Sequence, residues 1–443
     1  MPAPGRPSFS VRTAAWYGDR EITLSLPDSW HLEVIAPKPC SPLSGDQIVE
    51  RLEHPLGQQP IRELARGKAR PLIIVDDLNR PTPAEPVVNA LIAQFQDAGI
   101  PAGDVRIMIA PGTHGAPKAG AVEKKIGSEA AKACTVLIHD CHAPMARAGR
   151  TSFGTPVLVN PEVVRSDLVV GVGGVYPNNT AGFGGGTKLA LGVLGFRSIA
   201  ALHYGHSGAG WGASGGNSTF REDLDEIARL ISLSASVSLL VDADRRIIDL
   251  FCGDPMKYYP QAVRRARDVF GAPAPGEASV VISNAYPNDL SLTFLSMKGV
   301  APLNRASPAA SRIAIAACSE GHGFHGLFPF HNAPAGHRRQ VLTARALELA
   351  RRPAEIAAIS KRVVSRLSRN RRRGVVPQEF VPQRHPIWIY RPGGNLPALP
   401  DSIPGYRVAG SWDQILEGVA AEQGDRGQLE ARLYACAPLQ WLF

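Results

Sequence analysis

The sequence predicts an α/β protein of two domains, each with a mostly parallel sheet flanked by helices. The chain has 443 residues, which is more than a single hydrophobic core usually serves. Short apolar runs such as Pro71–Val75 and Val105–Ile109 are bounded by turn residues, as buried strands are. Helix-like segments such as Val87–Ala98 separate these runs, and this alternation is typical of a parallel sheet.

The composition excludes several classes of protein. The hydrophobic fraction of 44% is ordinary for a soluble globular chain. No apolar run approaches the length of a membrane helix, and the first residues contain no apolar signal segment, so we expect a cytoplasmic protein. The six cysteines form no CxxC pair, which argues against a disulfide framework or a zinc ribbon. The net charge of +9 suits an anionic ligand, and no nucleic-acid-binding motif accompanies it.

Two features of the chain suggest its outer organisation. Ile22–Leu26 and His31–Ile35 alternate apolar and polar residues, and we expect them to form a strand pair joined through Pro27–Ser29. Arg267–Gly276 has the pattern of a helix end followed by a linker rich in proline and glycine. We therefore expect an N-terminal domain of residues 1–272 and a C-terminal domain of residues 277–443.

Polar residues follow two of the expected strands. Asp77 and Arg80 come directly after the first, and His114 lies in a glycine loop after the second. Open α/β sheets bind ligands beyond the carboxyl ends of their strands, and imidazole titrates near neutral pH, as an acid/base group must. A proline-terminated turn with a surface ion pair, and a plain loop histidine, explain the same residues from sequence alone.

The segment from Asp167 to His206 has the parts of a phosphate site: a strand, a turn, a glycine cluster and Lys188. It is no P-loop, because Thr187 stands where glycine should precede the lysine. It also departs from the dinucleotide fingerprint GxGxxG, because Tyr176 stands where the last glycine is required. A phosphate site and a simple tight turn therefore both remain open.

Later segments are less informative. His139, Cys141 and His142 end a strand, but alternate strand residues face opposite sides and cannot all bind one ion. A loop holding His322 and His325 can be a turn with solvated imidazoles. The basic run over residues 338–373 has the charge of a solvated helix face or of an anion-binding surface.

These motifs, in this order over most of residues 70–330, resemble the lactate racemases that use a nickel-pincer nucleotide, a pyridinium-3,5-bisthiocarboxylic acid mononucleotide carrying nickel. The central motif of that family is approximately P-H-x-x-A-G-F-x-G-G-x-K, with a histidine some way further on. The matching residues here are Pro177, Ala181, Gly182, Phe183, Gly185, Gly186 and Lys188, followed by His203.

The resemblance implies the cofactor-binding residues. Lys188 would be joined to the cofactor as a thioamide, and His203 would ligate nickel. Asp77 would contact the nucleotide. The glycines Gly182, Gly185 and Gly186 belong to the same cofactor-binding motif.

The resemblance also implies the catalytic residues. Arg80 would meet the substrate carboxylate, as its planar fork allows. His114 would be one acid/base group, and Lys298 would face the substrate from the C-terminal domain. The active site would then lie in the cleft between the two domains.

Two departures from the family pattern bear on the reaction. Asn178 stands where the family has its second catalytic histidine, and an amide has no group that titrates near neutral pH. Leu295 stands where a glutamine is expected. Tyr176, His206 or a histidine of the 322–325 loop could replace the lost base, the substrate could carry its own, or the enzyme could work on one substrate face only.

We therefore expect a racemase or epimerase of a 2-hydroxy acid other than lactate, acting by hydride transfer to the nickel-pincer nucleotide. The alternatives are an enzyme acting on one substrate face by redox exchange or elimination, and a cofactor-carrying protein without turnover. A third class is an anion- or nucleic-acid-binding module that uses the basic run. The expected partners are the small-molecule substrate and the cofactor-biosynthesis enzymes, with no membrane or nucleic acid.

Overall fold

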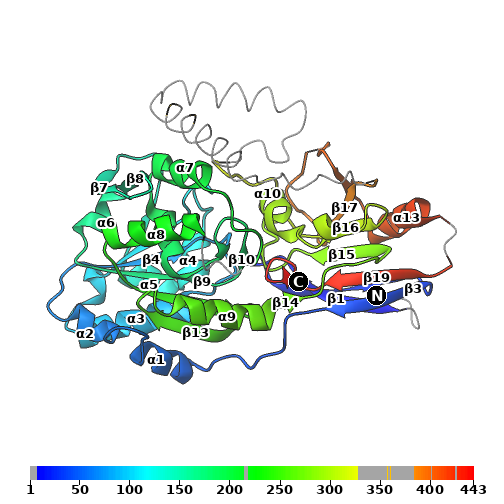
Figure 1. The fold of residues 1–443 in the computed structure, drawn as a ribbon. Coiled ribbons are helices and arrows are strands. Elements are labelled where there is room, and N and C mark those ends of the chain that lie inside the picture. The colour runs from blue at the N-terminus through cyan, green and yellow to red at the C-terminus, as the bar shows by residue number, and fades with distance from the viewer. Residues whose placement is uncertain are drawn as a thin grey trace. The chain divides into compact units, whose positions relative to one another are not determined.

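The computed structural model describes residues 7–213, 218–327, 384–400, 402–424 and 427–443, together with Ala357 and Ser360. These residues fall into two compact units (Figure 1). The central unit holds residues 39–268, and the terminal unit holds residues 7–38, 269–327 and the described residues from 384 onward. Each unit has a sheet rich in parallel strands with helices beside it, which confirms the predicted α/β class. Apart from Ala357 and Ser360, the basic run lies outside the described residues.

The central unit is built on a six-stranded sheet in the order β13-β12-β9-β4-β5-β6. Only the pair β12–β13 is antiparallel; the other neighbours run parallel. In chain order the strands are β4 (Pro71–Asp76), β5 (Arg106–Ala110), β6 (Thr135–Ile138), β9 (Leu168–Gly174), β12 (Leu233–Val241) and β13 (Ile247–Gly253).

Helices and two short ribbons complete this unit. The helices are α1 (Gly45–Glu53), α2 (Ile61–Ala65), α3 (Glu85–Asp97), η1 (Ala102–Asp104), α4 (Ala121–Ile126), α5 (Ser128–Ala133), α6 (Pro161–Arg165), η2 (Gly186–Val193), α7 (Phe196–Gly205), α8 (Thr219–Leu230) and α9 (Tyr259–Phe270), which runs to the unit's end. The ribbons pair β7 (Ala146–Arg150) with β8 (Pro156–Val159), and β10 (Pro177–Asn178) with β11 (Gly182–Phe183).

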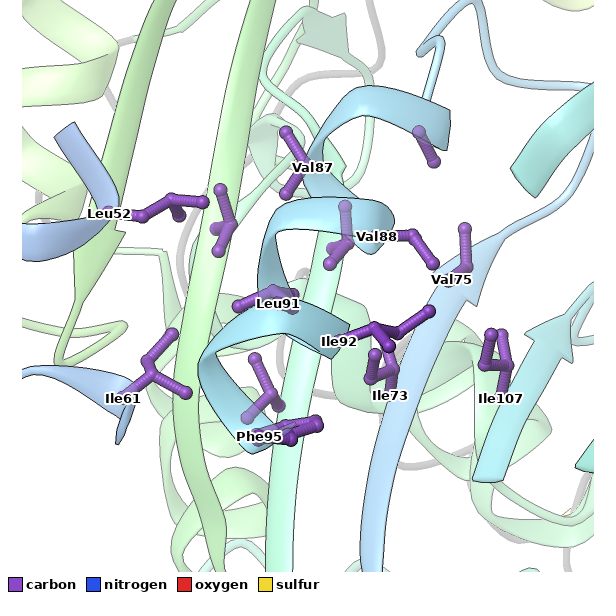
Figure 2. Close-up of a cluster of buried hydrophobic side chains, with 14 of the residues drawn as sticks. Leu52, Ile61, Ile73, Val75, Val87, Val88, Leu91, Ile92, Phe95 and Ile107 are labelled. Carbon is purple, nitrogen blue, oxygen red and sulfur yellow. The ribbon is translucent and has the colours of Figure 1, made fainter. Parts of the chain in front are cut away.

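Helix α3 covers one face of the central sheet through a continuous apolar stripe. Figure 2 shows Leu91 and Phe95 of α3 beside strand residues such as Ile73, with Leu52 of α1 and Ile61 of α2 completing the cluster. Leu91, Phe95 and Ile73 are fully buried. Because α3 has apolar residues at helical spacing, and Ile73 and Val75 lie on the same face of the largely apolar strand β4, the two elements bury these faces against each other.

On the opposite face, η2 lies directly on strand β9. Gly171 and Gly173 are two residues apart and therefore face the same side of the strand. A methyl group on either would come within 3 Å of the Leu189 side chain. The missing side chains thus make room for η2, the element that carries Lys188.

The terminal unit has a second six-stranded sheet, wholly parallel, in the order β18-β17-β16-β15-β19-β3. Its apolar residues pack into two clusters that include Ile389 and Ile282. The elements are β1 (Ser8–Thr13), β2 (Arg20–Ser25), β3 (Trp30–Ile35), β14 (Gly271–Ala272), β15 (Val280–Asn284), α10 (Leu292–Phe294), η3 (Leu295–Gly299), η4 (Leu303–Arg305), β16 (Ser311–Ile315), β17 (Ile387–Tyr390), β18 (Tyr406–Ala409), α13 (Trp412–Gln423), β19 (Leu429–Tyr434) and β20 (Trp441–Leu442).

The N-terminal segment departs from the sequence prediction. The expected pairing of Ile22–Leu26 with His31–Ile35 is wrong: β2 pairs with β1, and β3 pairs in parallel with β19. Because this pairing places β3 in the second sheet, residues up to 38 belong with the C-terminal part of the chain. The structure therefore divides the chain differently from the expected 1–272 and 277–443. Among the described residues, no helix is both long and apolar enough to cross a membrane.

Candidate functional site

The polar residues predicted after β4, β5 and β9 share one edge of the central sheet. These three strands are neighbours and run parallel, so their carboxyl ends meet at that edge. Asp77 and Arg80 follow β4, His114 follows β5, and Tyr176 follows β9. The contacts described next join these side chains directly.

Asp77 holds one tautomer of His114. Its carboxylate Oδ2 lies 3.0 Å from Nδ1 of His114 and accepts a hydrogen bond of 2.7 Å from Asn79. Burial acts to raise the pKa of Asp77, but His114, Arg80 and Asn79 outweigh it and hold the pKa well below its usual range. Because an ionised carboxylate only accepts, Nδ1 carries the proton and Nε2 of His114 keeps its lone pair.

Arg80 connects this pair to Tyr176. Its guanidinium nitrogen lies 3.4 Å from Nε2 of His114, and its central carbon lies 6.0 Å from the centre of the Tyr176 ring. Burial raises the pKa of Tyr176 above its usual range, although Arg80 opposes the shift. The phenol is therefore protonated at neutral pH and can donate a hydrogen bond, but it is not a ready replacement for a basic histidine.

Lys125, which no sequence motif indicated, fixes the loop that carries Asp77 and Arg80. Its side chain is 1% exposed. The ammonium lies 2.5 Å from a carboxylate oxygen of Asp76 and donates to the carbonyl oxygens of Asp77 at 3.1 Å and Arg80 at 3.4 Å. The ammonium thus reaches oxygens at the end of β4 and in the loop after it, which sets the path of the backbone there.

Asn178 stabilises a turn. Its side-chain oxygen accepts hydrogen bonds from the amides of Thr180 and Ala181, both at 3.0 Å, and from the Thr180 hydroxyl at 2.6 Å. This is the pattern of an Asx turn, in which the side chain replaces a backbone acceptor. The residue at the position of the family's second catalytic histidine therefore has a structural role in this chain.

The predicted cofactor-binding glycines shape the turn that follows. Gly182, Gly185 and Gly186 all have positive φ angles, which side chains disfavour. The amide of Gly184 donates to the carbonyl of Tyr176, and the amide of Gly186 donates to the hydroxyl of a serine on β12. These two amides are thus used within the protein, and the cofactor contacts of the glycines stay a prediction.

Lys188 follows this turn as a half-buried amine. Among the described residues, no hydrogen bond or ion pair engages its ammonium group. Burial lowers the pKa of Lys188 to about 7, and the positive charges of Arg80 and Arg221 act in the same direction. A large share of this lysine is therefore neutral, and nucleophilic, near neutral pH.

His203 presents a fixed ring nitrogen. Its Nδ1 lies 2.8 Å from the carbonyl oxygen of Ile199, one turn earlier in α7, so Nδ1 carries the proton and Nε2 keeps the lone pair. Burial lowers the pKa of His203 to about 4, with Lys188 and His114 adding to the shift. The ring is therefore neutral at physiological pH, as a metal ligand must be. No cluster of three or more His, Cys, Asp or Glu side chains in the described part of the chain could hold a metal by itself.

His206, considered as a replacement base, has both ring nitrogens occupied. One lies 2.7 Å from the carboxylate of Asp223 and the other 3.0 Å from the hydroxyl of Thr219. The side chain is also buried. His206 therefore joins α7 to α8, and the ring is not free to meet a substrate.

The remaining predicted residue, Lys298, belongs to the terminal unit. It is buried near the end of η3, in the same turn as Leu295, which lies in an apolar cluster of that unit. In the loop after β16, the ring of His322 lies 3.1 Å from the carbonyl of Gly323. The site between the two domains, which would bring Lys298 to the others, stays a prediction.

Comparison with known proteins identifies the relatives of this chain. Residues 17–212 match the profile of the lactate racemase N-terminal domain. The lactate racemase of Thermoanaerobacterium thermosaccharolyticum is 28% identical over 70% of this chain and 76% of that protein. The lactate racemase of Lactiplantibacillus plantarum is 25% identical over 71% and 76%.

Two solved structures share the fold. The lactate racemase apoprotein from T. thermosaccharolyticum superposes with a TM-score of 0.70 at 19% identity, over 98% of this chain and all of that one. A protein from Thermotoga maritima, solved by a structural genomics consortium, has a TM-score of 0.56 at 15% identity, over 91% of this chain and 99% of that one. Both likenesses span nearly the whole chain, so they extend to the terminal unit as well.

Replacing Lys125 tests its role in the loop. Lys125→Met removes the cation and leaves the carboxylate of Asp76 half of a broken buried pair, so we expect a loss of about 3–5 kcal/mol in the free energy of unfolding. Lys124→Met, at the exposed neighbouring position, should change it by less than about 0.5 kcal/mol. Urea denaturation followed by circular dichroism measures both; equal effects would contradict the assigned role.

His139 generates a prediction on pH. Its ring lies 3.0 Å from the carbonyl of Leu194, just after η2, and burial lowers the pKa of His139 from 6.5 to about 4. The folded state then binds fewer protons than the unfolded state between these values, so stability falls as the pH drops from about 6.5 towards 4. The urea midpoint of His139→Gln should fall less than that of wild type between pH 7 and pH 5. The exposed His54→Gln should keep the wild-type difference, and a wild-type difference in His139→Gln would refute the assignment.

Proposed function

We propose that this chain is a member of the lactate racemase family, which it resembles in sequence and fold, and that it is an isomerase that racemises or epimerises a 2-hydroxy acid. The observation that carries the proposal is that two neighbouring elements each supply one reactive nitrogen group, Lys188 on η2 and His203 on α7. Lys188 is an amine with a pKa of about 7 and no acidic partner among the described residues. His203 is a neutral imidazole whose Nδ1 is bonded to the helix backbone.

These two residues fit the nickel-pincer nucleotide that the resemblance implies. A neutral amine is the form that can attack a thiocarboxylate carbon, whose oxygen would leave as water when the thioamide forms, and imidazole is a suitable nickel ligand. Lys188 would hold the nucleotide covalently, and Nε2 of His203 would bind its nickel. When bound, the cofactor supplies a centre that accepts and returns a hydride.

The residues at the sheet edge would bind the substrate and move its proton. Arg80 would bind the carboxylate of a 2-hydroxy acid through its fork of donors. Nε2 of His114 would take the hydroxyl proton and later return it, because it is the basic nitrogen of that ring. Asp77 keeps this tautomer and would stabilise the imidazolium that forms, as a buried carboxylate does beside a catalytic histidine.

The second substrate face distinguishes this chain from the family pattern. Inversion needs proton transfer on both faces, and the side-chain oxygen of Asn178 is committed to its turn. Leu295 is buried in an apolar cluster where a polar residue is expected. We therefore propose a 2-hydroxy acid other than lactate, whose own functional group or a group from the terminal unit serves the second face.

A second candidate follows from the same observation at Asn178. With a single acid/base residue the enzyme would act on one face only. It would oxidise one 2-hydroxy acid to the 2-keto acid and use the same two electrons to reduce a different 2-keto acid. The net reaction transfers a hydride and a proton from the 2-hydroxy acid to the 2-keto acid, and the new 2-hydroxy acid forms with a single configuration.

The cofactor is tested first by intact mass and metal content. Protein co-expressed with the cofactor-biosynthesis enzymes should gain the mass of the nucleotide, and Lys188→Ala should not. His203→Ala should keep the covalent adduct but lose nickel, which separates the two roles. An unmodified wild-type protein would refute the cofactor assignment.

The reaction is tested with the loaded protein and a panel of single-enantiomer 2-hydroxy acids, analysed by chiral chromatography. We expect inversion of at least one substrate, and a loss of about 10²–10⁴-fold in His114→Gln with the adduct retained. Isotope exchange between a 2-hydroxy acid and a different 2-keto acid, without inversion, would favour the one-face reaction. Neither inversion nor exchange would refute both candidates.

A further inference from the structure

The turn that precedes Lys188 is held by Arg221, a residue of α8 that no sequence motif indicated. Arg221 is 5% exposed. Its guanidinium donates to the carbonyl oxygen of Phe183 at 2.7 Å and to that of Gly185 at 3.0 Å. It also reaches the hydroxyl of Thr187 at 3.3 Å. The planar guanidinium thus holds Phe183, Gly185 and Thr187, which are every second residue of the turn that ends at Lys188.

Neighbouring residues hold Arg221 in place. The guanidinium lies 4.0 Å from the centre of the Tyr259 ring and donates to its hydroxyl. That hydroxyl in turn donates to the carbonyl of Phe183 at 3.1 Å. The hydroxyl of Thr187 donates at 2.5 Å to Asp225, which lies on the same helix as Arg221. The turn is therefore fixed against α8 at both of its ends.

The two charged side chains that act on Lys188 are both positive. Arg80 and Arg221 both act on it electrostatically, and His203 on α7 is a neutral neighbour that feels the charge of Lys188. Asp225, one turn further along α8, accepts a hydrogen bond from Thr187 and also interacts electrostatically with Arg221. Within the described residues no ion pair joins Lys188 or Arg221 to a carboxylate. The guanidinium thus binds carbonyl and hydroxyl oxygens, and its positive charge acts on the amine without a carboxylate in direct ion-pair contact.

We propose that Arg221 is a positioning residue that presents the amine of Lys188 as a nucleophile, by fixing the turn through its carbonyl groups and by adding a positive charge to the surroundings of the amine. The inference rests on the proposed function for the identity of the group that Lys188 attacks. It concerns the reactivity of the amine itself, which can be measured without that group.

A purely structural role for Arg221 makes a different prediction. Each carbonyl that Arg221 holds has a second donor: Phe183 accepts from Tyr259, and Gly185 accepts from the amide of Lys188. Removing the guanidinium therefore leaves neither carbonyl without a partner, and the variant has the means to fold. If the role is structural only, stability changes while the reactivity of Lys188 does not.

The test is competitive acetylation of the cofactor-free protein with trace acetic anhydride, read by peptide mass spectrometry over a range of pH. The exposed Lys124 serves as the internal reference in the same sample. In Arg221→Met the acetylation rate of Lys188 near pH 7 should fall about fivefold, because losing a neighbouring positive charge raises the pKa by about one unit. Arg229→Met, on the exposed end of the same helix, should leave the rate unchanged.

Arg221→Lys separates position from charge. It keeps the positive charge but cannot hold two carbonyl groups with one planar fork, so the pH midpoint for Lys188 should stay near that of wild type while the rate falls. An unchanged rate in both Arg221 variants would overturn the proposal. If Arg221→Met does not fold, as judged by circular dichroism, an unchanged rate in Arg221→Lys overturns it alone.

The same variants, co-expressed with the cofactor-biosynthesis enzymes, give a second readout by intact mass. We expect a lower yield of the adduct in Arg221→Met than in Arg229→Met. If the wild-type protein gains no adduct although acetylation of Lys188 still depends on Arg221, the proposed function fails and this inference stands. If the adduct forms equally in all variants and acetylation is unchanged, the inference fails and the proposed function stands.

Discussion

The close packing of η2 on strand β9 is the constraint on which the candidate site depends. A methyl group at Gly173 would lie 2.4 Å from Leu189 and 2.9 Å from the carboxylate of Asp76. At the other end of η2, a methyl group at Gly192 would lie 2.7 Å from the carbonyl of Ala110 at the end of β5. Because Gly173 and Gly192 have no side chains at these contacts, the element carrying Lys188 packs against the strands at van der Waals distance. The residues after β4 and β5 then come within reach of it.

The charges at this edge are arranged so that cations outnumber the anions available to neutralise them. Asp76 is paired with Lys125, and Asp77 is bonded to His114. Arg80 and Arg221 have no ion pair with a carboxylate among the described residues. Such an excess attracts anions and lowers the cost of bringing a carboxylate or a phosphate out of water. An anionic substrate and a nucleotide cofactor both fit this field.

Sequence reasoning found the residues that follow strands and those in the central motif, Lys188 and His203, but it missed two supporting residues on other helices. Asp77, Arg80 and His114 were predictable because neighbouring parallel strands end at one edge, and that rule needs no side-chain detail. Lys125 and Arg221 reach the same loops from α4 and α8, and nothing in their local sequence distinguishes them from surface residues.

Strand pairing and local backbone geometry could not be predicted from the sequence. The strand pair near the N-terminus looked like a hairpin because the two strands are adjacent in sequence, yet β3 found its partner in β19, at the far end of the chain. In the glycine cluster two amides bond within the protein, and a role of the cluster in binding an anion stays a prediction. The substitution at Asn178 was evident from the motif, but its use as an Asx turn depends on the path of the backbone.

The bond between His203 and the carbonyl of Ile199 has a consequence for how this part of the site can change during evolution. The acceptor belongs to the main chain one helical turn away, so every sequence that keeps α7 helical supplies it. Many metal-binding histidines instead rely on a separate carboxylate to orient the ring, and mutation of that partner lowers metal affinity by about 10–100-fold. Here the ring orientation depends on the helix backbone, so the side chains around it can change without altering it.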